Sequence, residues 1–85
     1  MIITNFEAIL KVMKWTSAIH HNTLIFEDPT DQIFIRIHKN YIVIGQYVQR
    51  SDNTGHDILC ECENLDETLD YIINLDMNTL PPNGK

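Results

Sequence analysis

Two cysteines separated by one residue are the first side chains in this sequence that could carry chemistry. Cys60 and Cys62 flank Glu61, and thiolates serve as zinc ligands and as nucleophiles. Either His20-His21 or His56 could in principle complete a tetrahedral zinc site with these two thiolates. The pair lacks a second ligand pair at a recognised spacing, and small cysteines are common on the buried face of a strand. We therefore expect two core cysteines, with no metal and no cofactor.

Carboxylates are the second group of candidate functional residues. Residues 1–50 hold four acids and five bases, for a charge of +1, whereas residues 51–85 hold eight acids and one lysine, for −7. No calcium loop, P-loop, G-x-S-x-G or H-E-x-x-H motif is present in the sequence. The acids that begin the expected last helix are favoured there by the helix dipole, whatever the function. We therefore assign no catalytic residue and expect a protein that is not an enzyme.

Five of these acids would form what we call the acidic edge, because they follow the expected last strand into the expected last helix: Glu61, Glu63, Asp66, Glu67 and Asp70. Like charges three and four residues apart on a helix repel one another. A negative ridge on a rigid frame can mimic the phosphates of a nucleic acid, and it would bind the basic surface of a larger protein. An acidic face that only keeps the protein in solution explains the same pattern.

The elements that must position these residues are organised around one alternating segment, residues 33–49. The alternation predicts a β-hairpin with a two-residue turn at Lys39-Asn40. In this register three isoleucines on one face, Ile33, Ile35 and Ile37, pair with Gln46, Ile44 and Ile42. The resulting apolar surface must be covered by the rest of the chain.

The residues before this hairpin predict a helix, a connection and a strand. Thr4 and Glu7 have the spacing of a capping box, and the apolar stripe of the helix would consist of Phe6, Ile9, Leu10 and Met13. The helix should end near Lys14 or Trp15. Residues 16–22 show no clear period, so we interpret them as a connection that places Trp15 and Ile19 under the sheet.

The first strand is expected at Thr23–Glu27, followed by a type I turn at Asp28-Pro29-Thr30-Asp31. Pairing Glu27 with Gln32 across this turn places Phe26 beside Ile33 and Leu24 beside Ile35. All of these apolar residues then lie on the face that the central hairpin already defines.

The residues after the hairpin predict a fourth strand at Asp57–Glu63 and a second helix. Pairing Val48 with Ile58 would bring three more side chains into the core, those of Ile58, Cys60 and Cys62. Asn64 caps the helix with Glu67 in the reciprocal position. Its apolar stripe is Leu65, Leu69, Ile72 and Ile73.

These elements predict an α+β fold, a two-layer sandwich of a helix, a four-stranded antiparallel meander and a second helix, with both helices on one face of the sheet. Residues 1–77 would form a single α-β-β-β-β-α domain, and residues 78–85, which contain Pro81-Pro82, a flexible tail. Chains of this length form one domain. The N-terminus lacks a secretory signal and no apolar run could cross a membrane, so we expect a cytoplasmic protein with reduced cysteines.

The face of the sheet that the helices leave open offers an alternative binding surface. It would carry Phe34, Arg36, Tyr41 and Tyr47, and an open sheet with exposed aromatic residues can bind single-stranded RNA by stacking. Glu61 and Glu63 on the same face would repel phosphates. A third possibility is a structural subunit that forms a homodimer through the exposed edge of the first or fourth strand.

In size, acidity and its helix-meander-helix layout, the chain is similar to the small phage-encoded inhibitors that block nucleases and other nucleic-acid-binding enzymes. This resemblance covers architecture and charge only. It implies an anti-defence or host-takeover protein that acts in the host cytoplasm, with the acidic edge as a nucleic-acid mimic.

Overall fold

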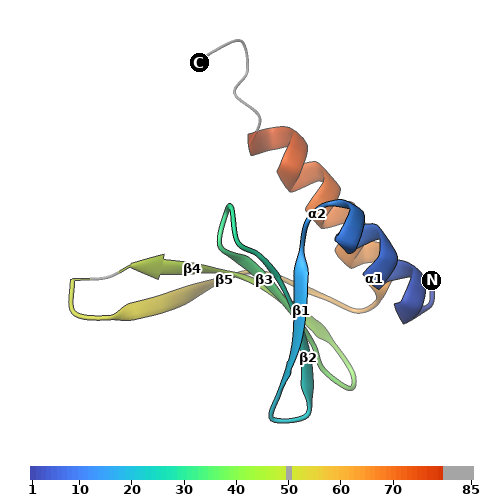
Figure 1. Ribbon diagram of the computed structural model, residues 1–85, viewed down its shortest axis with the longest axis horizontal. Coiled ribbons are helices and arrows are strands. Elements are labelled where there is room, and N and C mark those ends of the chain that lie inside the picture. Colours follow the sequence, from blue (N-terminus) through green and yellow to red (C-terminus); the bar gives the residue numbers. More distant parts are fainter. Residues whose placement is uncertain (50, 80–85) are drawn as a thin grey trace.

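The computed structural model describes residues 1–49 and 51–79, which form two helices and a five-stranded antiparallel sheet. The elements follow the order α1 (Ile3–Val12), β1 (Thr16–His20), β2 (Thr23–Asp28), β3 (Ile33–Ile37), β4 (Ile42–Gln49), β5 (Thr54–Cys62) and α2 (Leu65–Thr79). Each strand pairs with the next one along the chain. Figure 1 shows that the sheet is strongly twisted, so that β1 and β2 run across the direction of β4 and β5. The α+β class predicted from the sequence is confirmed, with five strands instead of four.

One hydrophobic cluster joins the helices to the sheet. Phe6 and Leu10 of α1 and Ile72 of α2 pack with alternate residues of the strands, including Phe26, Ile33, Ile35, Ile42, Ile44 and Cys62. The rings of Phe6 and Phe26 meet edge to face, with centroids 5.4 Å apart. We call this side of the sheet the core face. Because side chains alternate along a strand, the residues between them lie on the opposite face.

β1 is the strand that the sequence analysis missed. It pairs with β2, and the two are joined by His21 and Asn22, whose φ angles of 50° and 64° are typical of a tight type I′ hairpin turn. Every residue of β1 is exposed, so no burial pattern reveals it. Trp15 is buried as predicted, but Ile19 is 73% exposed, so its predicted place under the sheet is wrong. The strand predicted at Thr23–Glu27 is consequently internal, and β1 is the edge.

The N-terminal end of α1 differs from the prediction. The helix begins at Ile3, with Ile2 as its N-cap and no side-chain cap, so the capping box predicted at Thr4 is wrong. The carbonyl oxygen of Ile2 instead accepts the first hydrogen bonds of the helix, 3.2 Å long from the N–H of Phe6. Because the helix starts one residue before Thr4, the Thr4 hydroxyl cannot occupy the capping position.

The C-terminal end of α1 is a Schellman motif. Lys14 has a φ of 72°, the N–H of Lys14 donates to the carbonyl of Lys11 (3.0 Å), and that of Trp15 donates to the carbonyl of Leu10 (2.9 Å). This pair of bonds satisfies carbonyls at the end of the helix and reverses the chain. The turn therefore brings the buried side chain of Trp15 back towards Leu10, in the same core cluster.

The central hairpin has the predicted register, in which Ile35 pairs with Ile44 and Ile37 with Ile42. The register predicted between β2 and β3 is wrong, because Phe26 pairs with Ile35 and not with Ile33. The loop is longer than a type I turn. Asp28 accepts hydrogen bonds from the N–H groups of Thr30 (3.1 Å, to the carboxylate) and Gln32 (2.8 Å, to the carbonyl). A shift of two residues keeps every side chain on its predicted face.

A β-bulge in β5 changes which of its side chains enter the core. Ile44 pairs with Cys60 but Gly45 pairs with Ile58, which leaves Leu59 as the extra residue. Leu59 packs against the core cluster, whereas Ile58 is 52% exposed. The predicted pairing of Val48 with Ile58 and the burial of Ile58 are therefore wrong, because the bulge reverses the alternation.

α2 begins as predicted. The Asn64 side-chain oxygen accepts a hydrogen bond from the N–H of Glu67 (2.9 Å), and the Glu67 carboxylate accepts one from the N–H of Glu63 (2.8 Å). Ile72 is buried, but Ile73 is 42% exposed. The helix includes Asn78 and Thr79, the first two residues of the predicted tail, and residues 80–85 lie outside the described residues. Neither α1 nor α2, as described, is long and apolar enough to span a membrane.

Candidate functional site

The cysteines and histidines considered for a zinc site do not converge. Cys60 and Cys62 lie on the core face, with their sulfur atoms 3.8 Å apart. His20 and His21 lie at the turn between β1 and β2, towards the other edge of the sheet, and His56 lies opposite Tyr47. Within residues 1–49 and 51–79, no group of three His, Cys, Asp or Glu side chains could hold a metal ion.

The Cys62 thiol is in a poor environment for nucleophilic chemistry. Burial raises the pKa of Cys62, and the neighbouring Cys60 and Glu67 raise it further, against a lowering contribution from the Thr68 hydroxyl. The pKa of Tyr71 is raised by burial and by the two cysteines. A raised thiol pKa leaves less thiolate at neutral pH, so the structure favours a packing role for Cys62.

All five residues of the acidic edge are exposed. They follow one stretch of chain from the end of β5 into the first turns of α2 (Figure 1). Two have partners within the chain: Asp66 lies 3.4 Å from the N-terminal amine, and Glu67 caps the start of α2. In the described part of the chain, the carboxylates of the other three have no ion pair or hydrogen bond: Glu61, Glu63 and Asp70.

The opposite face carries a small aromatic cluster centred on Phe34. The ring of Phe34 has no exposed surface. It contacts the ring of Tyr47 (centroids 4.9 Å apart) and that of His56 (5.7 Å), and the guanidinium carbon of Arg36 lies 4.6 Å from its centroid. Phe34 pairs with Gly45 as predicted. Because its ring is covered, Phe34 is not available for stacking on a base in this structure.

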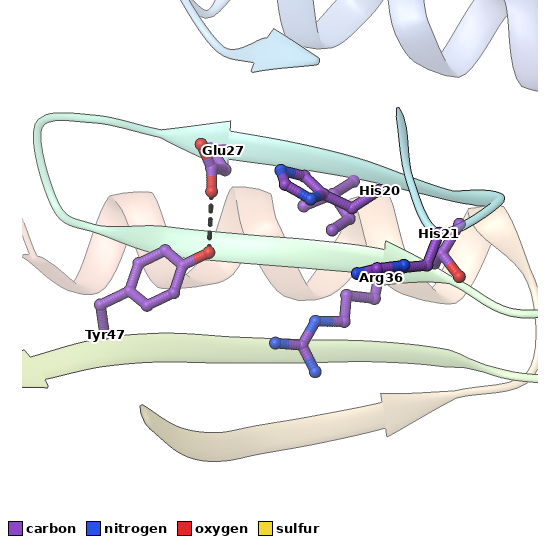
Figure 2. Close-up of a pocket in the computed structure, with 7 residues that line it drawn as sticks. His20, His21, Glu27, Arg36 and Tyr47 are labelled. Carbon is purple, nitrogen blue, oxygen red and sulfur yellow. Dashed lines mark hydrogen bonds between the residues drawn. The ribbon is translucent and has the colours of Figure 1, made fainter. Parts of the chain in front are cut away.

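Beside this cluster, the opposite face contains a cavity of about 390 Å³, which we call the hollow (Figure 2). Its lining residues come from β1, β2, β3, β4 and the β1–β2 turn: His20, His21, Thr23, Ile25, Glu27, Arg36 and Tyr47. Figure 2 shows Glu27 and Tyr47 towards one end and His21 towards the other, with the Arg36 guanidinium between them. The hollow thus has a carboxylate and a phenol at one end, an imidazole at the other and a guanidinium between them.

One hydrogen bond defines the acidic end of the hollow. The Tyr47 hydroxyl donates to the Glu27 carboxylate over 2.7 Å. Burial raises the pKa of Tyr47, and the hydrogen bond and charge of Glu27 raise it further, while Arg36 lowers it. Tyr47 therefore keeps its proton and holds the carboxylate in place.

The four residues of the predicted RNA-binding face are divided among three places. Arg36 and Tyr47 line the hollow, and Phe34 lies beneath them. Tyr41 is at the β3–β4 turn, where its ring stacks on His38 with centroids 4.6 Å apart.

Alternation places Glu27 on this face, and the structure confirms that position. Sequence reasoning missed the contributions of His20 and His21, because the strand that carries His20 was not recognised. The signal that could have revealed it is the His21-Asn22 pair, since Asn favours the left-handed conformation of such turns.

The fold and these two surfaces define the chain only as a small α+β protein with an acidic edge and a hollow on the sheet. Searches against protein-family models, curated proteins and solved structures found no match.

Proposed function

We propose that this chain is a non-enzymatic binding protein, an inhibitor that masks a basic, nucleic-acid-contacting surface of a larger protein. The observation that supports this most directly is the set of three exposed carboxylates without partners in the described chain: Glu61, Glu63 and Asp70. Carboxylates that only stabilise the start of a helix have partners within the chain, as those of Asp66 and Glu67 do. The unpaired three remain available for arginine or lysine side chains of a partner.

The charge distribution supports the same proposal. Residues 51–85 carry −7, and residues 1–50 carry +1. Such asymmetry orients a protein as it approaches a basic surface and accelerates association. In our interpretation both helices cover the core face, and the acidic edge lies at the rim where β5 leads into α2. This arrangement presents the charges from a rigid frame.

The proposed setting is the cytoplasm of a host cell, with a nuclease or another nucleic-acid enzyme as the target of a phage-type anti-defence protein. The resemblance in size, acidity and layout to such inhibitors supports this setting. The protein would act by occupying the site where the enzyme binds its nucleic acid, which requires no catalysis.

A pull-down from bacterial lysate tests the proposal. Tagged protein is incubated at low and at high salt, and bound proteins are identified by mass spectrometry while absorbance at 260 nm reports bound RNA. We expect a basic protein that binds at low salt, is released at high salt and comes without RNA, because salt screens exposed charges.

A charge-matched pair of variants makes the test specific. The first combines Glu61→Gln, Glu63→Gln and Asp70→Asn, which leaves the helix cap intact. The control neutralises three acids elsewhere, with Glu7→Gln, Asp31→Asn and Asp52→Asn. The proposal requires capture of the partner to fail with the first variant and to persist with the control, and equal capture by both would refute it.

Single-stranded RNA binding through the opposite face is a second candidate. It is favoured by Arg36, whose guanidinium is not neutralised by a carboxylate in the described chain. The full burial of Phe34 reduces the stacking surface that such binding would use. RNA recovered in the pull-down without a stoichiometric protein would support this second function.

A further inference from the structure

Arg36 is the cation of the hollow, and it is positioned without being neutralised. Its guanidinium lies over the ring of Phe34 at 4.6 Å from the centroid, and its side chain is half-buried. Within the described residues it has neither an ion pair nor a hydrogen-bond acceptor. A guanidinium offers five N–H donors in a planar fork that suits a phosphate or carboxylate. Arg36 is therefore preorganised for an anion that the described part of the chain does not supply.

Glu27 could be that anion, but Tyr47 holds it. Arg36 pairs with Ile25, two residues from Glu27 on β2 and on the same face, so the two side chains are diagonal neighbours across the strands. The Tyr47 hydroxyl instead donates to Glu27 over 2.7 Å. This hydrogen bond keeps the carboxylate at one end of the hollow and leaves the guanidinium free.

The remaining lining groups indicate the shape of the ligand. Figure 2 shows His21 at the end away from Glu27 and the His20 ring between Glu27 and His21. Imidazole N–H groups can donate to phosphate oxygens. Ile25 supplies an apolar surface in the middle. At the other end, the Glu27 carboxylate accepts the Tyr47 O–H and has further lone pairs that can accept an N–H of a ligand. A volume of about 390 Å³ is within the range of small-molecule sites and exceeds what a bare phosphate ion needs.

We propose that the hollow binds a nucleoside monophosphate, either as a free nucleotide or as the phosphorylated end of a strand. The phosphate would lie on Arg36 with His20 and His21, the sugar over Ile25, and the base would donate an N–H to Glu27. This site is separate from the acidic edge, so it does not depend on the proposed inhibitor function.

The test is a titration of ¹⁵N-labelled full-length protein, followed by NMR, with each of the four ribonucleoside 5′-monophosphates. Inorganic phosphate and the matching nucleosides serve as comparison probes. We expect at least one nucleotide to shift the signals of Arg36, His20 and His21 and to bind about tenfold or more tightly than phosphate, because the base adds contacts. A 5′-phosphorylated dinucleotide that binds more tightly than the nucleotide identifies a strand end as the source, and weaker binding identifies the free nucleotide.

Three variants connect binding to the named side chains. Arg36→Gln should weaken nucleotide binding by about tenfold or more, because it removes a charge-assisted hydrogen bond. The double change His20→Gln with His21→Asn leaves the Phe34 cluster intact, keeps a residue suited to the turn, and should also weaken binding. Lys39→Gln removes a cation outside the hollow and should leave binding unchanged.

Tyr47→Phe tests the arrangement that frees Arg36. It retains the ring on Phe34 but releases Glu27, which can then pair with Arg36, so binding of inorganic phosphate should weaken. Adding Glu27→Gln to this variant removes the competing carboxylate and should restore the binding of inorganic phosphate. A purely structural role of Tyr47 predicts no such rescue.

Four outcomes would overturn the proposal. They are no shift of the hollow residues with any nucleotide, equal binding of phosphate and nucleotides, equal nucleotide binding by Arg36→Gln and the unchanged chain, and a failure of Glu27→Gln to restore phosphate binding.

Discussion

The ring of Phe34 lies directly against the backbone of Gly45 on the neighbouring strand. A Cβ atom built at Gly45 would come within 2.3 Å of Phe34 Cζ and within 2.9 Å of the carbonyl oxygen of Asp57. The bulge of β5 occurs at this point, between the pairs formed by Ile44 and Gly45. The absence of a side chain at position 45 thus allows the aromatic ring to be buried on a face that the core cluster does not cover.

We expect Gly45→Ala to lower the free energy of unfolding by about 1–3 kcal/mol, because overpacking displaces the ring or the strand. Chemical denaturation of both proteins measures this loss. Repeating the substitution in a Phe34→Leu background provides the control, since the smaller side chain relieves much of the clash and the two changes should be non-additive. Fully additive losses would show that the ring is not what excludes a side chain at position 45.

The raised pKa of Tyr47 predicts a dependence of stability on alkaline pH. The folded state keeps the Tyr47 proton to a higher pH than the unfolded state, whose tyrosine titrates near the ordinary value of 10.0. The contribution of the Tyr47 proton to the free energy of unfolding is therefore complete below pH 10, and it is lost as the pH rises through the pKa of Tyr47 in the folded state. Denaturation midpoints measured between pH 9 and 11 should fall.

Tyr71 and Cys62 also have raised pKa values and contribute in the same direction, so their effects must be separated from that of Tyr47. Tyr47→Phe and Tyr71→Phe should each reduce the slope of stability against pH above 10. If Tyr47→Phe leaves this slope unchanged, the hydrogen bond to Glu27 does not protect the Tyr47 proton.

The sequence allowed the central hairpin to be predicted correctly because its period of two and its short turn specify a single register. Three features were not accessible in this way. β1 has no buried face that could produce a pattern. The loop after Asp28 is longer than a type I turn and is held by hydrogen bonds to the carboxylate and the carbonyl of Asp28. The bulge at Leu59 interrupts an otherwise regular alternation. Local periodicity reports which side of a strand is buried, but such irregularities depend on neighbouring strands.

The same limits apply to the candidate sites. The acidic edge can be located from charge and from the cap at Asn64 alone. Arg36 and Tyr47 were placed on the correct face by alternation. The hollow could not be anticipated, because it requires β1 to bring His20 beside β2, and the position of His56 beside Phe34 requires the bulge.

The environment of Cys62 predicts unequal thiol reactivity. Cys62 is buried with a raised pKa, whereas Cys60 is only partly buried. We expect one thiol of the folded protein to react with an aromatic disulfide reagent at pH 8 and the second to react only after unfolding, because attack requires an accessible thiolate. Cys60→Ser and Cys62→Ser assign the two phases. Rapid reaction of the Cys60→Ser protein in its folded state would contradict the burial of Cys62.

The left-handed conformation of Lys14 predicts a stabilising substitution. Lys14 occupies the position after the α1 C-cap with a φ of 72°, a conformation that glycine adopts without steric cost. Lys14→Gly should raise the free energy of unfolding by about 0.5–1 kcal/mol, since the strain relieved exceeds the added entropy of the unfolded chain. Lys11→Gly is the matched control: it removes the same charge inside the helix and should destabilise by about 1 kcal/mol. Thermal denaturation compares the two variants. If both destabilise the protein, Lys14 does not adopt the left-handed conformation at the end of α1.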